Sequence, residues 1–394
     1  MAASIASIQA ALTQRGLDGW LFYDFHNRDV LGTRILGLSE TGLSTRRWYY
    51  FIPAQGTPVR IVHAVEPEKL DSLPGRKIIY LSWEQQHTAV RDALGTPPRK
   101  IAMQYSPMNN IPYISMVDAG TIELIRSFGH EIVSSADLVQ IFEAIIDETG
   151  FASHVEAGRL VQRIKDEAFE EIRDSIRSNT GLTEFDVASH ILQKFEANGL
   201  ITHDMPIVGV NDHPANPHFE PTRENARSFR PGDCVLIDLW AKLKKPKSIY
   251  YDITWCGYIG SMPPAKYSEI WLIVVDARKT AVEFIRERFR KGEKCFGWEV
   301  DDACRAVVRN AGYDRYFVHR TGHSIGEEVH GNGVHIDNLE TKEERELVPG
   351  ICFSIEPGIY LKGEMAVRSE INVCIKPDGD IIIAGAEQEE LLLI

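Results

Sequence analysis

Four carboxylates in the second half of the chain each lie within an apolar, strand-like run. They are Asp238 in CVLIDLW, Asp252 in YYDITW, Glu356 in CFSIEPG and Glu370 in AVRSEINV. Burial of an unpaired carboxylate is costly, so each acid needs a proton, a cationic partner or a metal ion. For any one acid alone, a local arginine or a strand end that faces water is the simpler explanation. Four in one domain favour two divalent cations, whose combined charge balances four carboxylates.

A short segment between these runs offers imidazole ligands. In HRTGHSIGEEVH, His319, His323 and His330 are interspersed with Gly322 and Gly326. Glycine lets the backbone approach a crowded polar centre closely. One core histidine is usually structural, whereas three in so short a segment indicate a site. The spacing differs from the helical H-E-x-x-H of the mononuclear zinc proteases.

Arg368 precedes Glu370 by two residues, so in a strand the two side chains point to the same face. The guanidinium could therefore hydrogen-bond to the carboxylate and orient it without binding the metal itself, as metal ligands commonly require. A plain salt bridge between the two side chains is the alternative interpretation.

In order along the chain, the segments IDLW, YYDIT, HRTGHSIG with a following VH, FSIEPGIY and VRSE resemble the ligand-bearing elements of the pita-bread metallopeptidases. That family includes methionine aminopeptidase, aminopeptidase P and prolidase. Nearly the whole chain is covered, because YSPMNNIP and VDAGT are similar to the N-terminal domain of creatinase and prolidase. Methionine aminopeptidases lack that domain and are disfavoured. The resemblance implies that Asp238 binds one metal ion, that His323 and Glu356 bind the other, and that Asp252 and Glu370 bridge the two.

The resemblance also implies a mechanism. A carboxylate-rich site with one imidazole suits two divalent ions, and we favour manganese over cobalt, iron or zinc. The ions would share a water and present it as hydroxide to the scissile carbonyl. Glu356 would carry the proton to the leaving nitrogen, and His330 would donate to the developing oxyanion. His319 and His218 would line the substrate site, although His213 lies close enough to His218 to take its place.

The reaction implied is hydrolysis of a peptide bond on the amino side of proline by a prolidase that accepts dipeptides. The nearest alternative is an aminopeptidase P that accepts longer Xaa-Pro peptides. Two others are a hydrolase or lyase of small amide-like solutes on the same fold, and a silent binding protein, which the complete ligand set disfavours. The lysine-rich spacer 242–247, Trp255 and Ile371 depart from the family pattern and concern the substrate more than the metal.

The elements that must position these residues form two domains. Short apolar runs alternating with polar stretches, together with a few helices, predict a mixed α/β domain over residues 1–150. The resemblance assigns residues 151–394 to an α+β pita-bread catalytic domain. Helices are expected over about 153–178, from Thr183 to Gly199, and over about 266–291 and 298–311.

Charge and cysteine content limit the partners and the location. With 43 Lys and Arg against 56 Asp and Glu, the formal net charge of -13 disfavours nucleic acid and membrane surfaces. No signal-peptide pattern begins the chain, and no apolar run approaches the ~20 residues of a membrane span. Six cysteines without a C-x-x-C pair argue against a disulfide framework or a thiolate metal site. We therefore expect a cytoplasmic enzyme with a small peptide substrate and, because relatives are commonly homodimers, a homodimer.

Overall fold

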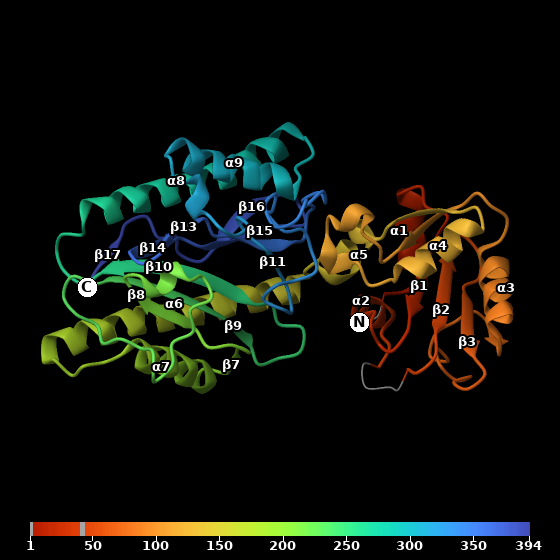
Figure 1. Ribbon diagram of the computed structural model, residues 1–394, viewed down its shortest axis with the longest axis horizontal. Coiled ribbons are helices and arrows are strands. Elements are labelled where there is room, and N and C mark those ends of the chain that lie inside the picture. Colours follow the sequence, from red (N-terminus) through yellow and green to blue (C-terminus); the bar gives the residue numbers. More distant parts are fainter. Residues whose placement is uncertain (1–2, 40–43) are drawn as a thin grey trace. The chain divides into compact units, whose positions relative to one another are not determined.

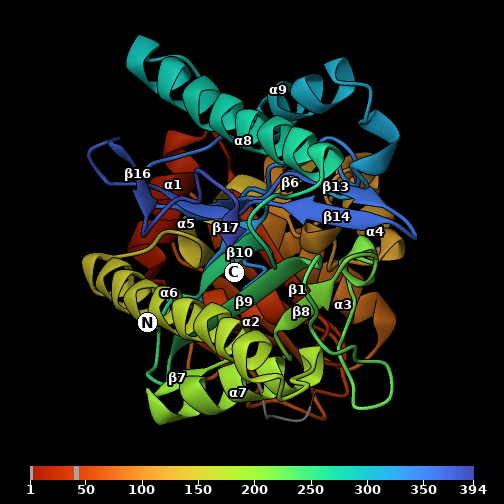
Figure 2. The ribbon, with the colours of Figure 1, turned by 90° about the vertical axis from the view of Figure 1, so that its left-hand side faces the viewer.

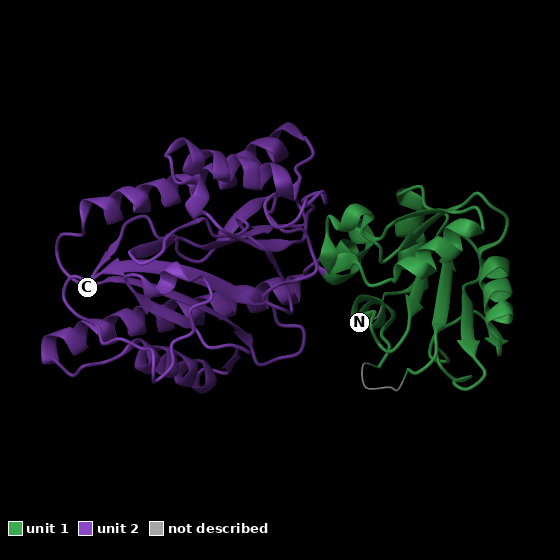
Figure 3. Cartoon of the chain, viewed as in Figure 1, with its two compact units in different colours: residues 1–143 green, residues 144–394 purple. Residues whose placement is uncertain are grey.

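The computed structural model describes residues 3–39 and 44–394. The chain divides into two compact units, residues 1–143 and residues 144–394, which Figure 3 colours separately. The boundary expected at residue 150 lies a few residues later, inside the long helix α6 (Glu148–Ser178). None of the helices in the described part is long and apolar enough to cross a membrane.

Unit 1 is a mixed sheet covered by helices on both faces. Its helices are α1 (Ile5–Gln14), α2 (Val30–Leu36), α3 (Trp83–Leu94), α4 (Ala119–Ser127) and α5 (Ala136–Glu143), and its strands are β1 (Gly19–Asp24), β2 (Trp48–Pro53), β3 (Val59–His63), β4 (Arg76–Tyr80), β5 (Lys100–Met103) and β6 (Glu131–Ser134). The strands lie in the order β4-β3-β2-β1-β5-β6. Strand β2 is antiparallel to β1 and β3, and the remaining pairs are parallel.

The two faces of this sheet explain why β1 is buried at every position. Side chains alternate along a strand, so Trp20 and Phe22 pack into one core with α1, α2 and α5. Leu21 and Tyr23 point the other way and pack with α3 and α4. This arrangement confirms the mixed α/β fold expected for the first domain.

Unit 2 is built from two small sheets, a hairpin and four long helices. The helices are α6, α7 (Glu184–Ala197), α8 (Ala265–Lys291) and α9 (Gly297–Asn310), and the strands are β7 (Leu200–Ile201), β8 (Ile207–Val210), β9 (Cys234–Leu243), β10 (Tyr251–Tyr258), β11 (Ser324–Ile325), β12 (Cys352–Ile355), β13 (Gly358–Leu361), β14 (Met365–Arg368), β15 (Ile371–Ile375), β16 (Ile381–Ala384) and β17 (Leu392–Leu393). The four helices form close to their expected bounds. The Thr183 hydroxyl accepts from the Asp186 amide at 3.2 Å, and Asp186 accepts from the Thr183 amide at 3.0 Å, so the predicted capping box is present.

The strands of unit 2 lie between two helical layers, α8 with α9 and α6 with α7 (Figures 1 and 2). Alternation along β9 separates its faces: Ile237 and Leu239 pack against α6 and α7, whereas Leu236 lies in the core of α8 and α9. Strand β10 divides in the same way, with Ile253 on the α6 side and Cys256 on the other. The polar residues that alternate with Ile237, Leu239 and Ile253 along these strands therefore point away from α6, towards the second sheet, across the space between the two sheets.

The second sheet presents its polar side to the same space. Strands β11, β12, β15 and β16 pair in that order and are antiparallel. Phe353 and Val373 face the core of α8 and α9. The alternate positions are Ser354 and Asn372. Asn372 hydrogen-bonds to Asp252 of β10, and Ser354 hydrogen-bonds to His323 and Glu356.

Cys352 and Cys374 form a disulfide between β12 and β15. The two residues are direct cross-strand partners with Cα atoms 4.1 Å apart, although 22 positions separate them in sequence. The sequence argued against a disulfide framework, and it did not reveal this single bond. Its signal lies in the register of two strands, which cysteine spacing does not reveal. The other four cysteines, Cys234, Cys256, Cys295 and Cys304, are free and buried.

Candidate metal centre

The structure brings together all five residues predicted as metal ligands. His323 Nε2 lies 3.5 Å from Asp252 Oδ2 and 3.4 Å from Glu356 Oε1. Ligand atoms of Asp252, His323 and Glu370 lie within 4.8 Å of one another. Asp238 and Glu370 meet at the hydroxyl of Thr254, which is 3.0 Å from Asp238 Oδ1 and 2.8 Å from Glu370 Oε2. Ligands of one cation lie about 3 to 4 Å apart, so this spacing suits metal ions.

Register in the β9–β10 hairpin sets the positions of the two aspartates. Asp238 pairs with Thr254 and Asp252 pairs with Trp240, which leaves both acids on the face opposite α6. Most of the lysine-rich spacer forms the connection between the strands, as expected, while Lys242 still belongs to β9 and pairs with Ile201. The longer spacer therefore does not displace either aspartate.

The two glutamates lie just outside strand ends. Glu356 follows β12, and its amide donates to the Thr321 carbonyl at 2.7 Å. Glu370 lies in the break between β14 and β15, where its amide donates to the Thr254 carbonyl at 3.4 Å. Beside it, the buried Arg278 of α8 donates to the Ser369 hydroxyl at 2.6 Å. Backbone contacts to other elements thus fix both acids.

The tautomer of His323 suits metal binding. Its Nδ1 lies 3.2 Å from the Ser324 carbonyl oxygen, which can only accept, so Nδ1 carries the proton. Nε2 then carries a lone pair, and this atom faces Asp252 and Glu356. The His323 amide donates to the Ser354 hydroxyl at 3.0 Å, which fixes the backbone.

Gly322 allows the histidine segment to lie against β12. A Cβ atom at this position would lie 1.9 Å from the Ser354 carbonyl oxygen. At Gly326 the nearest atom would be 3.9 Å away, so a side chain there would meet no obstacle. The close approach inferred for both glycines is therefore correct for Gly322 and wrong for Gly326.

Burial raises the pKa of all four carboxylates. It raises the pKa of Asp238 to about 6 and of Asp252 to about 7, while Arg368 opposes the shift at both. The pKa of Glu356 is raised, and that of Glu370 is raised well above its usual range, by burial and by the neighbouring acids. The acids destabilise one another's charged forms, and nearby divalent cations would remove that cost.

Two carboxylate oxygens test whether the site fits metal ions. Asp252 Oδ1 and Glu370 Oε1 are buried and have no hydrogen-bond partner within the described residues. A buried, unsatisfied carboxylate oxygen is costly and calls for an explanation. These are the two residues expected to bridge the ions, and the donor set of four carboxylates and one imidazole suits divalent cations of the manganese-to-zinc range. The residues therefore fit a two-metal site.

Arg368 contacts a different acid from the one expected. Its guanidinium forms a very short contact with Asp238 Oδ2 and donates from Nε to the Thr254 hydroxyl at 2.8 Å. The expected pairing with Glu370 assumed a continuous strand, but β14 ends at Arg368 and β15 begins at Ile371. Both side chains still reach the Thr254 hydroxyl, Arg368 Nε at 2.8 Å and Glu370 Oε2 at 2.8 Å, so they lie on the same side as expected. Arg368 nevertheless lies directly behind the ligands, as its supporting role requires.

The three predicted substrate histidines differ in their surroundings. His330 is exposed, and its ring meets that of His323 edge-on with 4.5 Å between centroids. Repulsion between the protonated forms of His330 and His323, together with partial burial, the charge of Arg320 and the nearby His218, lowers the pKa of His330 to about 3. His319 uses both ring nitrogens, donating from Nδ1 to the Arg320 carbonyl at 2.7 Å and accepting from the Tyr360 hydroxyl at 2.6 Å.

The structure also separates His218 from His213. His213 lies 2.9 Å from the buried carboxylate of Glu184 and stacks against Phe219, so it stabilises its own loop. His218 is exposed and acts electrostatically on His330. This arrangement favours His218 over His213 for the substrate side.

Sequence reasoning missed the residues that support the ligands. Thr254 joins Asp238 to Glu370, Ser354 donates to Glu356 at 3.2 Å, and Tyr360 lies between His319 and Arg368. Asn372 accepts from the Asp252 amide at 3.1 Å. Thr254, Ser354 and Asn372 each stand two positions from a predicted ligand in a strand-like run, which was the available signal, whereas Tyr360 stands four positions after Glu356 and has no such signal.

Comparison with known proteins places this centre in a family. Residues 156–377, more than half of the chain, match the model described as metallopeptidase family M24. The chain is 27% identical over 347 residues to the probable dipeptidase PepE of Mycobacterium tuberculosis, with 87% of this chain and 84% of that protein covered. It is 32% identical over 216 residues to an Xaa-Pro dipeptidase of Lactobacillus helveticus, about half of each protein.

The fold agrees with this match. The crystal structure of dipeptidase PepE from Mycobacterium ulcerans gives a TM-score of 0.70 at 25% identity and covers 99% of this chain and 96% of that one. The architecture is thus the pita-bread fold with an α/β N-terminal domain that the sequence predicts. A carboxylate–imidazole centre between two sheets, on a fold and sequence of this kind, shows that the chain belongs to metallopeptidase family M24.

Proposed function

We propose that this chain is a two-metal hydrolase that cleaves Xaa-Pro dipeptides. The observation that carries the proposal is the convergence of Asp238, Asp252, His323, Glu356 and Glu370, with an unsatisfied oxygen on each of the two acids that we propose as bridging ligands. Asp238 would hold one ion, His323 and Glu356 the other, and Asp252 and Glu370 both. When bound, two such ions supply a water activated towards hydroxide and polarise the scissile carbonyl.

Glu356 is the acid best placed to move a proton. Its side chain is 12% exposed, against 9% for Asp238 and 7% for Asp252, so it is the most accessible of the three. The Ser354 hydroxyl donates to Oε1 and leaves Oε2 available. A raised pKa brings Glu356 closer to neutrality, where a group can both accept and return a proton.

His330 supports substrate binding from the solvent side. Its low pKa keeps the ring neutral near pH 7, so it offers one N–H donor and no positive charge. A neutral donor beside the ligand His323 suits an oxyanion that forms only during the reaction. His319 would act through Tyr360, whose hydroxyl donates a hydrogen bond to it. His218 would line the entrance to the substrate site.

Preference for proline rests on the relatives. One is called an Xaa-Pro dipeptidase and another a probable dipeptidase, and we extend both terms to this chain as a proposal. Manganese as the native metal, a homodimeric assembly and a cytoplasmic location belong to the same proposal.

The test combines metal analysis with paired substrates. Purified protein with the Cys352–Cys374 bond intact should contain two equivalents of a divalent metal, and manganese should restore the most activity after chelation. It should cleave an Xaa-Pro dipeptide faster than a tripeptide with the same first two residues. A faster tripeptide would indicate an aminopeptidase P, and two metals without peptide cleavage would indicate a solute-active enzyme. Protein that binds no metal would refute the proposal.

A further inference from the structure

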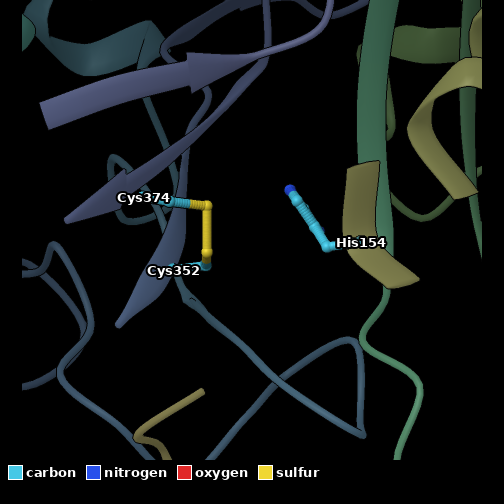
Figure 4. A group of neighbouring side chains, drawn as sticks. All are labelled: His154, Cys352 and Cys374. Carbon is cyan, nitrogen blue, oxygen red and sulfur yellow. A yellow bond between two sulfur atoms is a disulfide. The ribbon is translucent and has the colours of Figure 1, made fainter. Parts of the chain in front are cut away.

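A second cluster with metal-ligand chemistry lies on the strands beside the carboxylates. Cys352, Cys374 and His154 each offer a ligand atom, and these atoms lie within 4.8 Å of one another. The two cysteines are 2% exposed and His154 is fully buried. Figure 4 shows the imidazole extending from α6 towards the two sulfur atoms.

The ring of His154 has an unused nitrogen. Nδ1 lies 2.6 Å from the Tyr250 carbonyl oxygen, which can only accept, so Nδ1 carries the proton. Nε2 is therefore a lone pair, and it has no hydrogen-bond partner among the described residues. A buried acceptor without a partner costs stability and calls for an explanation, and this nitrogen is free to bind a ligand.

Hydrophobic side chains pack around this cluster. Buried neighbours of the two cysteines are Ile146, Ile249, Tyr250 and Ile325, with Phe151, Trp240, Val329 and Ile382 packed around them. An isolated charge would be costly there. Two thiolates and a neutral imidazole around a divalent cation carry no net charge, so this set can be buried. Thiolate ligands favour zinc over manganese, magnesium or calcium.

We propose that the reduced protein binds a single Zn²⁺ through Cys352 Sγ, Cys374 Sγ and His154 Nε2, and that the disulfide is the alternative, metal-free state of this site. A dithiol reductant supplies two electrons and two protons, becomes a disulfide itself and leaves two cysteine thiols. Zinc binding then releases both thiol protons to solvent. Sulfur atoms bonded to each other lack the thiolate charge that zinc requires, so the two states exclude each other. The site is independent of the proposed peptidase activity.

The experiment uses Co²⁺ as a coloured substitute for zinc in the full-length protein. Protein kept with a dithiol reductant should show six thiols after denaturation, and oxidised protein should show four. Sulfur coordination gives a thiolate-to-cobalt charge-transfer band, which the carboxylates and histidine of the catalytic centre cannot produce. Reduced protein should show this band for a single equivalent of Co²⁺, displaced by Zn²⁺, and oxidised protein should show none.

Three variants locate the band. C352S/C374S should abolish it, and His154→Gln should weaken Co²⁺ binding at the band by at least about tenfold, because one ligand is lost. Cys304→Ser, which removes a buried thiol of α9, is the matched control and should leave the band unchanged. The proposal is overturned by a reduced protein without the band, by a band that survives in C352S/C374S, or by a thiol count that stays at four under reductant. Unchanged binding in His154→Gln would overturn the three-ligand assignment.

Discussion

At the scale of single residues, the hydroxyl of Thr254 joins two acids that would otherwise repel each other. It accepts from Arg368 Nε and lies within hydrogen-bond distance of both Asp238 and Glu370. Its single proton can serve only one acid at a time, so it orders the pair without neutralising it. Polar groups that orient ligands in this way commonly contribute one to two orders of magnitude to metal affinity.

Thr254→Val should therefore weaken metal binding by about 10- to 100-fold while it preserves the shape of the side chain. Metal titration by calorimetry measures the change, and circular dichroism checks the fold. Thr254→Ser keeps the hydroxyl and should bind metal nearly as tightly as the wild type. Equal affinity in Thr254→Val and the wild type would show that the hydroxyl does not support the ligands.

His330→Ala should lower kcat by roughly 100-fold or more, because it removes a donor needed only in the transition state. Metal affinity should remain within about twofold of the wild type, since the ring contacts His323 without being a predicted ligand. His203→Ala, another exposed histidine, is the control and should leave both quantities unchanged. Loss of metal instead of kcat would place His330 among the ligands.

Acids within apolar runs predicted the candidate ligands. The residues that hydrogen-bond to these ligands could not be predicted in this way. An acid within an apolar run is detectable in sequence, because its burial demands compensation. The partner of Arg368 is not, since it depends on where β14 ends and on how β9 lies across from it. Thr254 escaped attention for the same reason, because its role arises only when three distant segments meet.

At the scale of elements, the segment that carries His323 depends on a glycine for its approach to β12. Gly322→Ala should cost about 1 to 3 kcal/mol in unfolding free energy, because its Cβ would lie 1.9 Å from the Ser354 carbonyl oxygen and the segment would have to move. Metal binding should weaken with it. Gly326→Ala, with no atom nearer than 3.9 Å, should preserve both stability and binding. Chemical denaturation and metal titration of the two variants compare them directly, and equal effects would refute the argument.

The helices of unit 2 were predictable because their signals are local. Helical periodicity and the capping box at Thr183 involve neighbouring residues only. The Cys352–Cys374 bond is different, because it follows from the register of β12 against β15. Along β12 and just beyond it, every second residue from Cys352 is Ser354 and then Glu356. Along β15 and just before it, every second residue back from Cys374 is Asn372 and then Glu370. One strand pair therefore supports both the carboxylate centre and the cysteine cluster.

At the scale of the whole molecule, His154 makes stability depend on pH. Burial lowers its pKa from 6.5 to about 4, so folding keeps the ring neutral while the unfolded chain binds a proton below 6.5. The stabilisation is present above pH 6.5 and is lost as the pH falls to about 4, a difference of about 3 kcal/mol. Chelated, oxidised wild type should therefore lose about that much more unfolding free energy over this range than His154→Gln. Parallel losses in both proteins would show that His154 is not the group responsible.

The division into two units predicts where metal binding stabilises the chain. All five candidate ligands lie in residues 144–394, and each unit has hydrophobic cores of its own. A ligand that binds only the native state suppresses the openings that break its site. Adding manganese to chelated protein should therefore slow amide hydrogen exchange in β9, β10, β12 and β15 and leave β1 and β2 of unit 1 unchanged. Asp252→Asn, which removes an expected bridging charge at nearly constant size, should show little slowing anywhere. Equal slowing in both units would mean that the metal acts through the whole chain, and slowing confined to unit 1 would place the metal site elsewhere.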